Sequence, residues 1–178
     1  GLEKTGVCSF KIAETLDTGE IMARRETSIP SDENAAGLEE KLVALGLETL
    51  QETLDKVKRG ETKGLPQAGP SSYAPLLKKE DAKIDWKRAA QEIDRKVRGL
   101  VRMGAFCLGP KNEILKILSA KPVESPGSQE PGTVIFIDEK NGFVVKCGLD
   151  ALLVSKVRPE GKKEMDAWSY LQGNSLKA

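Results

Sequence analysis

The 178-residue sequence has the composition of a globular protein, with 39% hydrophobic and 31% charged residues. Its apolar runs are far shorter than the roughly 20 residues that a membrane-spanning helix needs, and the N-terminal residues lack the basic and apolar regions of a signal peptide. We therefore expect a cytoplasmic protein without membrane contacts. The chain has no histidine, which removes the commonest general base and the commonest metal ligand. No metal site is predicted.

The charge is distributed unevenly along the chain. Residues 1–60 carry a net charge of −4, whereas residues 61–178 carry a net charge of +5. Opposite signs in the two parts indicate two units with different partners. The positive excess of the second part is compatible with nucleic-acid binding, and also with an ordinary solvated surface.

The first sixty residues predict two strands and a long helix. Residues 6–14 and 20–29 alternate between apolar and polar side chains, so we expect an antiparallel pair with Asp17 at the connection. A helix is predicted over residues 35–59. Its candidate N-caps are Ser31, Asp32 and Asn34. Its predicted core face consists of Leu38, Leu42, Leu45, Leu50, Leu54 and Val57.

Residues 61–82 are rich in Gly, Pro and Ser near their middle and are interpreted as a linker. An amphipathic helix is predicted within residues 78–101, with Asp85 as its candidate cap. Short apolar runs separated by turn residues follow, and Asn141-Gly142 between two of them is a strong hairpin signal. Such strands are typical of a small OB-like barrel, and a short helix is expected to close the chain.

Four stretches, in order, resemble the C-terminal part of the methionyl-tRNA formyltransferases. They are TGVCSFKIAETLDTGEIM, YAPLLKKEDAKIDW, PGTVIFIDEKNGFVVKCG and VRPEGKKEMDAWSYLQG. The first is shared by the enzymes of this superfamily that use 10-formyltetrahydrofolate. The second also occurs in formyltetrahydrofolate dehydrogenase and in sugar formyltransferases. The last favours the tRNA enzymes.

The resemblance implies an α/β fold in three parts. Residues 1–60 correspond to the end of a Rossmann-like formyltransferase domain, residues 61–82 to a linker, and residues 83–178 to an OB-like tRNA-binding domain. The implied reaction transfers a formyl group from 10-formyltetrahydrofolate to the α-amino group of methionyl-initiator tRNA in translation initiation. The implied protein is a monomer in a bacterial cytosol or in an organelle.

The resemblance also assigns roles to the loop around Asp17. In the family, this Asp belongs to a catalytic trio with an Asn and a His, and the residues before it touch the folate's pteridine ring. The corresponding residues here are Ala13, Glu14, Thr15 and Leu16. We expect Gly19 to let the backbone turn so that the acid points into the pocket. The family's Asn and His precede Gly1, so this chain alone is expected to be inactive.

Basic residues near the linker and near the end of the chain are candidates for contact with tRNA phosphates. They are Lys78, Lys79, Lys83, Arg98, Lys162 and Lys163. The alternative interpretation is a solvated helix face paired with nearby acids.

Two other functions stay open. The first is another enzyme that uses 10-formyltetrahydrofolate, namely a sugar formyltransferase or the hydrolase unit of formyltetrahydrofolate dehydrogenase. The second is a non-catalytic module that binds RNA through its barrel.

Overall fold

The computed structural model describes residues 1–174. The chain divides into two compact units, an N-terminal unit (Leu2–Leu76) and a C-terminal unit (Leu77–Ala178). Both combine helices with antiparallel strands, which confirms the mixed α/β class. Within residues 1–174, none of the helices has the length and apolar character needed to cross a bilayer.

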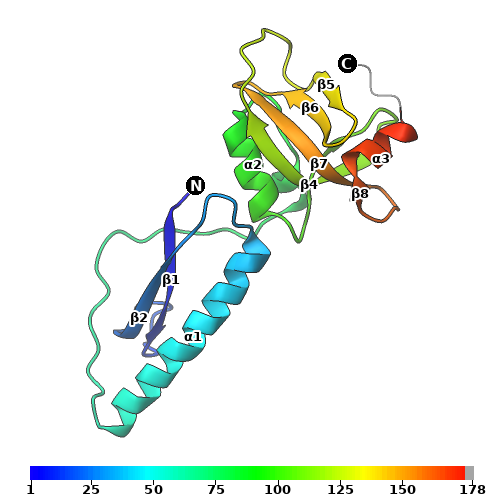
Figure 1. The fold of residues 1–178 in the computed structure, drawn as a ribbon. Coiled ribbons are helices and arrows are strands. Elements are labelled where there is room, and N and C mark those ends of the chain that lie inside the picture. Colours follow the sequence, from blue (N-terminus) through cyan, green and yellow to red (C-terminus); the bar gives the residue numbers. More distant parts are fainter. Residues whose placement is uncertain (175–178) are drawn as a thin grey trace. The chain divides into compact units, whose positions relative to one another are not determined.

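The N-terminal unit is a two-stranded ribbon with one long helix beside it (Figure 1). Strands β1 (Lys4–Phe10) and β2 (Ile21–Ser28) pair antiparallel, as predicted. Helix α1 (Ala35–Lys58) runs along this ribbon, where the Ser9 and Thr53 hydroxyl oxygens lie 2.5 Å apart. Because β1 and β2 are antiparallel, the loop that connects them lies at one end of the ribbon.

Asn34 is the residue that caps α1. Its side-chain oxygen accepts the backbone N–H groups of Ala36 and Gly37 at 3.0 and 3.1 Å. These are two of the donors that have no partner inside the helix, so the cap fixes where the helix begins. Of the three predicted caps, Asn34 has the correct position.

The predicted core face of α1 is wrong in its second half. Leu38, Leu42 and Leu45 are half-buried, as expected, but Leu50, Leu54 and Val57 are about half exposed. Five residues separate Leu45 from Leu50, which rotates the side chain by about 140° around the helix. The face that begins at Leu45 continues instead through Thr49, which is 2% exposed.

The C-terminal unit is built on an antiparallel sheet with α2 packed against it (Figure 1). The strand order is β3 (Ala105–Leu108), β4 (Ile114–Val123), β7 (Ala151–Pro159), β6 (Gly142–Lys146) and β5 (Val134–Asp138). Strand β8 (Met165–Asp166) pairs with β7 outside this path. In the described part of the chain, β3 and β5 share no ladder, so a closed OB-like barrel is not confirmed.

The hairpin predicted at Asn141-Gly142 joins β5 to β6. The Asp138 carboxylate accepts the backbone N–H of Lys140 and both the backbone and side-chain N–H of Asn141, at 2.8–3.0 Å. These hydrogen bonds, above all the one from the Asn141 side chain, lower the pKa of Asp138. Gly142 has a φ of 119°, which a side chain would resist.

The segment before the sheet differs from the single helix that the sequence predicts. It forms a short 3-10 turn, η1 (Lys79–Ala82), and then α2 (Ala90–Gly99). Between them the Ile84 N–H donates to the Phe106 carbonyl at 2.7 Å, which holds this stretch extended beside β3. Asp85 therefore caps no helix, and its carboxylate accepts the Lys87 N–H in a turn.

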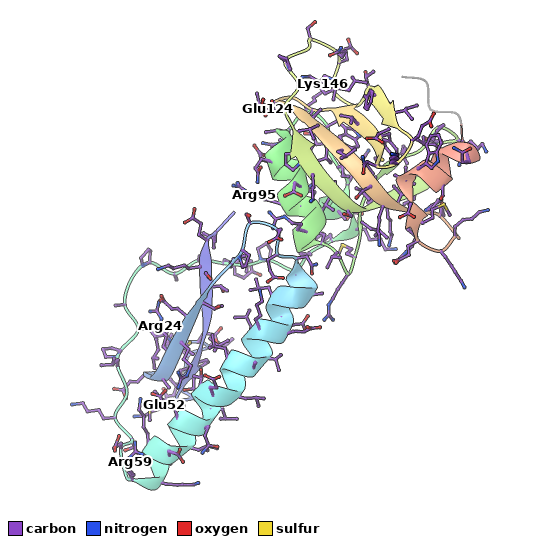
Figure 2. The ribbon with its side chains drawn as sticks, in the orientation of Figure 1. Arg24, Glu52, Arg59, Arg95, Glu124 and Lys146 are labelled. Carbon is purple, nitrogen blue, oxygen red and sulfur yellow. The ribbon has the colours of Figure 1, made fainter. Side chains whose placement is uncertain are left out.

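The core of the C-terminal unit lies between the sheet, α2 and the short helix α3 (Ala167–Gln172). Ile93 and Val97 of α2 pack into it beside β4 and β7. Lys146, labelled in Figure 2, is 6% exposed, and its ammonium donates to the Ser125 carbonyl at 2.6 Å. This bond ties the loop after β4 to β6.

Candidate functional site

The connection between β1 and β2 is a closed loop. The Lys11 backbone N–H donates to the Glu20 carbonyl at 3.0 Å, and its ammonium donates to the Glu20 carboxylate at 2.7 Å. That carboxylate also accepts the Gly64 N–H at 3.1 Å. The Lys11 hydrogen bond, followed by the Gly64 N–H, lowers the pKa of Glu20. The base of the loop is thus fixed by a charged pair and by backbone hydrogen bonds.

Asp17 lies in this loop with a left-handed backbone, at a φ of 56°. Asp is among the few residues that adopt this conformation readily. The Gln67 side-chain amide donates to the carbonyls of Asp17 and Gly19, at 2.8 and 3.0 Å. The Asp17 side chain itself is exposed, so the structure does not confirm the expectation that the acid points into a pocket. The backbone is therefore held while the carboxylate stays accessible.

Gly19 serves this loop differently from what the sequence suggests. Its φ is not positive; the left-handed residue is Asp17. A Cβ on Gly19 would lie 1.7 Å from the Lys11 carbonyl oxygen. Glycine is needed because the two sides of the loop pass too closely for any side chain.

The four residues predicted to touch folate precede Asp17 at the outer part of the loop. Ala13, Glu14, Thr15 and Leu16 are all exposed, and the Leu16 side chain is 90% exposed. The Thr18 hydroxyl donates to the Thr15 carbonyl at 3.0 Å, which closes the turn that contains Asp17. The structure thus brings the five residues together in one exposed turn.

In the C-terminal unit, Lys79 and Lys162 line the same groove, although 83 positions separate them in the sequence. The groove has a volume of about 420 Å³. Met103, Phe106 and Ile114 give it an apolar lining. Two predicted tRNA contacts therefore lie around one concave surface.

The groove also contains two cations that the sequence analysis missed, Lys116 and Arg158. They are direct partners in the register of β4 and β7. The Lys116 ammonium donates to the Met103 carbonyl at 2.8 Å, and the Arg158 guanidinium pairs with Glu164 at 3.2 Å. Strand register could have revealed this pair, but the sequence does not give the pairing of β4 with β7.

The other predicted tRNA contacts have different surroundings. Lys78, Lys83 and Lys163 are exposed. Arg98 is only 21% exposed at its side chain, and its guanidinium donates to Asp94 at 2.8 Å. Arg98 is therefore engaged in an ion pair on α2, as the alternative interpretation expected for this helix.

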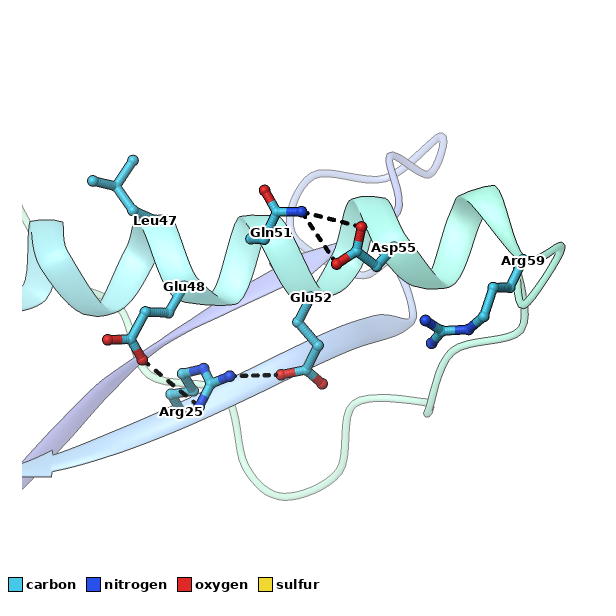
Figure 3. Close-up of a pocket in the computed structure, with 7 residues that line it drawn as sticks. All are labelled: Arg25, Leu47, Glu48, Gln51, Glu52, Asp55 and Arg59. Atoms are coloured by element: carbon cyan, nitrogen blue, oxygen red, sulfur yellow. Dashed lines mark hydrogen bonds and ion pairs between the residues drawn. The ribbon is translucent and has the colours of Figure 1, made fainter.

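A further hollow of about 610 Å³ lies along α1 and contains charged side chains of both signs (Figure 3). The Arg25 guanidinium pairs with Glu52 at 3.1 Å and with Glu48 at 3.8 Å. The Arg25 Nε is buried without a hydrogen-bond partner. These ion pairs connect β2 to α1, and we assign the hollow no catalytic or binding role. Over residues 1–174, no three His, Cys, Asp or Glu side chains gather in a group that could hold a metal ion.

The family model described as "Formyl transferase, C-terminal domain" matches residues 76–175. The methionyl-tRNA formyltransferase of Thermodesulfovibrio yellowstonii is 38% identical over 176 residues, which cover 99% of this chain and 56% of the relative. The enzyme of the same name from Symbiobacterium thermophilum is 37% identical over 97% of this chain and 54% of the relative. The chain thus spans about half the length of these relatives.

Solved structures show the same fold at lower identity. HypX from Aquifex aeolicus in complex with tetrahydrofolic acid has a TM-score of 0.70 at 20% identity, covering 95% of this chain and 30% of HypX. An N-formyltransferase from Helicobacter canadensis has a TM-score of 0.64 at 17% identity, covering 85% of this chain and 56% of that protein. Together with the match over residues 76–175, the relatives confirm the resemblance seen in the sequence: the chain belongs to the formyl transferase family, whose C-terminal domain it contains.

Proposed function

We propose that this chain acts as part of a methionyl-tRNA formyltransferase. The enzyme would transfer a formyl group from 10-formyltetrahydrofolate to the α-amino group of methionyl-initiator tRNA. One observation carries the proposal: relatives of that name are 32–38% identical to this chain over nearly its whole length, through both units. A match to the C-terminal domain alone would have supported membership of the family, but it would not have indicated which substrate receives the formyl group.

The proposed division of labour follows the two units. Residues 1–60 belong to the catalytic domain, residues 61–82 link the domains, and residues 83–178 bind tRNA as an OB-like domain. The register shifts in β4 between Ile117 and Ala120 support the OB-like description, because bulges bend and coil a sheet. The last four residues of this range lie outside the described part of the chain.

Asp17 is proposed as the catalytic carboxylate. In the reaction, the amine nitrogen bonds to the formyl carbon, the bond from that carbon to N10 of the folate breaks, and one proton moves from the amine to N10. A tetrahedral oxyanion forms on the way. A carboxylate beside a His stabilises the protonated imidazole, which can donate to the oxyanion or relay the proton. The exposed Asp17 side chain on a fixed backbone supports this role, with the Asn and the His supplied by sequence outside this chain.

Ala13, Glu14, Thr15 and Leu16 are proposed to contact the folate. Their support is their place in the same turn as Asp17 and their exposure. An exposed leucine gives a planar ring an apolar surface, and the loop's backbone groups can hydrogen-bond to the edges of that ring. Folate would then lie beside the carboxylate that handles the proton.

The tRNA is proposed to bind across the groove that contains Lys79 and Lys162. Lys78, Lys83 and Lys163 neighbour these two residues in the sequence and extend the basic surface. Arg98 is the sixth predicted contact, although it is already paired with Asp94. Lysines that neutralise phosphates release counterions, so binding should weaken steeply with salt.

A sugar formyltransferase is the main alternative, since the Helicobacter canadensis protein was solved with dTDP-3-aminofucose. The groove favours tRNA, because its four cations outnumber its one carboxylate, Glu160, and a concavity with excess positive charge suits a polyanion. We also propose that the enzyme works as a monomer and in a bacterial cytoplasm; the relatives' source organisms support the second point alone.

The test is a titration of the whole chain with labelled initiator tRNA over a range of salt concentrations. We expect a clear salt dependence for the wild type. The double variant Lys79→Gln/Lys162→Gln should reduce the slope of log K against log salt by about 2. The matched control is Lys58→Gln/Lys63→Gln in the N-terminal unit, which should change it little. If both double variants reduced the slope equally, the proposal that tRNA binds at the groove would be contradicted.

A further inference from the structure

A second hollow of the C-terminal unit lies between the β5–β6 hairpin, β7 and α3, where α3 contacts β6, β7 and β8 (Figure 1). Its volume is about 140 Å³. It is lined by Lys140, Asn141, Ser155, Lys156, Asp166 and Trp168, and we call it the Trp168 hollow. These six residues are all different from those that line the groove containing Lys79 and Lys162. The Trp168 hollow is therefore a separate surface.

The walls of the Trp168 hollow are held by short contacts. The Asp138 carboxylate fixes the hairpin turn through three N–H groups. Gly142 lets α3 approach this turn, because a Cβ there would lie 2.8 Å from the Ala167 Cβ. The Ser155 hydroxyl donates to the Ser119 hydroxyl at 3.0 Å, which adds a side-chain contact between β7 and β4. The hollow is thus preformed.

Trp168 gives this hollow an aromatic wall. Tyr170, two positions later in α3, is 2% exposed and belongs to the core, whereas Trp168 is only half-buried. Positions two apart on a helix point in roughly opposite directions, so one ring faces the core and the other faces the hollow. A closed cavity of about 150 Å³ holds a benzene ring. The Trp168 hollow therefore has room for one flat ring.

Cations flank this ring. Lys140 and Lys156 are exposed, and neither ammonium forms an ion pair with a carboxylate in the part of the chain that the structure describes. The one carboxylate of the lining is Asp166, the partner of Lys156 in the register of β7 and β8. Its side chain does not cap α3, so its oxygens are available to a ligand. An aromatic ring beside an excess of cations is the combination that binds single-stranded nucleic acid.

We propose that the Trp168 hollow binds one unpaired nucleotide of the tRNA. The base stacks on Trp168, and the phosphates on either side of it lie against Lys140 and Lys156. Asp166 can accept two adjacent N–H groups from guanine, whereas uracil presents carbonyl oxygens on both sides of its one N–H. Guanine is therefore the expected base. The proposal rests on the proposed binding of tRNA, and it needs neither Asp17 nor formyl transfer.

The test is a fluorescence anisotropy titration of the whole chain with a labelled oligouridylate that carries one central guanosine. Trp168→Leu keeps an apolar side chain but removes the ring, so we expect the affinity to fall at least about fivefold. Trp168→Phe restores a ring and should return the affinity to within about twofold of the wild type. The matched control is Phe136→Leu, which removes a 57% exposed ring of β5 outside the hollow and should change the affinity less than about twofold.

The two lysines are tested through the salt dependence of the same binding. Lys140→Gln/Lys156→Gln should reduce the slope of log K against log salt by about 1.4, because each phosphate contact to a single strand contributes about 0.7. The matched control is Lys111→Gln/Lys121→Gln, which removes two exposed cations of the same unit outside the hollow and should change the slope little.

Circular dichroism verifies that each variant is folded. If Trp168→Leu is not, the lysine variants and the comparison with an oligouridylate that lacks guanosine still decide. Three results would overturn the proposal: equal losses in Trp168→Leu and Phe136→Leu, equal affinity for the oligonucleotides with and without guanosine, or equally tight binding of polyglutamate.

A parallel titration with initiator tRNA separates this proposal from the proposed function. Lys79→Gln/Lys162→Gln should weaken binding of the tRNA and leave the affinity for the oligonucleotide within about twofold of the wild type. If the wild type bound the oligonucleotide through Trp168 but did not bind initiator tRNA, the proposed function would fail while the single-stranded RNA site would stand.

Discussion

Lys116 on β4 and Arg158 on β7 lie directly opposite each other and line the same groove. Like charges in this arrangement repel, and a cross-strand pair contributes about 0.2–1 kcal/mol in either direction. A bound anion would remove that repulsion. If the groove binds tRNA as proposed, a phosphate there would offset this small stability cost.

Replacing one of these cations should separate stability from binding. Arg158→Gln removes the repulsion and a surface ion pair with Glu164, so we expect the free energy of unfolding to stay within about 0.5 kcal/mol of the wild type. The affinity for initiator tRNA should fall at low salt. Urea denaturation and a tRNA titration measure the two effects. A large loss of stability with unchanged binding would assign Arg158 a structural role.

Two glycine-to-alanine substitutions should act in opposite directions. Gly19→Ala forces a Cβ to within 1.7 Å of the Lys11 carbonyl oxygen, so it should destabilise the chain by about 1–3 kcal/mol. Gly46 lies inside α1, and a Cβ there would have nothing within 4 Å. Gly46→Ala should therefore stabilise the chain by about 0.5–1 kcal/mol. Denaturant titrations compare them. A neutral Gly19→Ala would mean that the loop is not tightly closed.

The loop that contains Asp17 should loosen in acid. The pKa of Glu20 is lowered from 4.5 in the folded state, so its stabilising contribution is complete above that value and is lost as pH falls through the folded pKa. The protection factor of the Gly64 N–H against hydrogen exchange should therefore fall as the pH drops below about 4.5.

Two variants verify the assignment to Glu20. Glu20→Gln should remove this extra pH dependence, because the side chain no longer titrates. Glu14→Gln, which alters an exposed carboxyl of the same loop, should preserve it. An unchanged profile in Glu20→Gln would show that another acid controls the loop.

The backbone at Asp17 predicts how substitutions there affect folding. Asn tolerates a φ of 56°, so Asp17→Asn should leave the free energy of unfolding nearly unchanged. Asp17→Val places a β-branched side chain in this conformation and should cost about 1–3 kcal/mol. Thermal or denaturant unfolding distinguishes the two. Equal stability of both variants would argue against the left-handed turn.

Local patterns predicted much of the fold. The alternation in β1 and β2, the Asn34 cap and the Asn141-Gly142 hairpin all depend on neighbouring residues, and each is confirmed. The errors arose where distant contacts decide. Leu149 pairs with Ala89 and accepts the Ala90 N–H at 3.0 Å, so the helix begins at Ala90 and not after Asp85, while the ribbon selects Thr49 over Leu50 as the buried side.

The candidate site shows the same division. The sequence placed Asp17 and the residues before it in one turn, which the structure contains. It could not show that Lys79 and Lys162 line a common groove, because that depends on how η1 lies beside the end of β7. The pairing of Lys116 with Arg158 was equally hidden, since it depends on strand register.

The central claim is that Asp17 is the catalytic carboxylate. Its most direct test is a chimera in which this chain follows the preceding part of the Thermodesulfovibrio relative, assayed for formylation of methionyl-initiator tRNA. Asp17→Asn should reduce turnover by about 10²–10⁴-fold while leaving tRNA affinity within twofold. Turnover within a few-fold of the unsubstituted chimera would contradict the account.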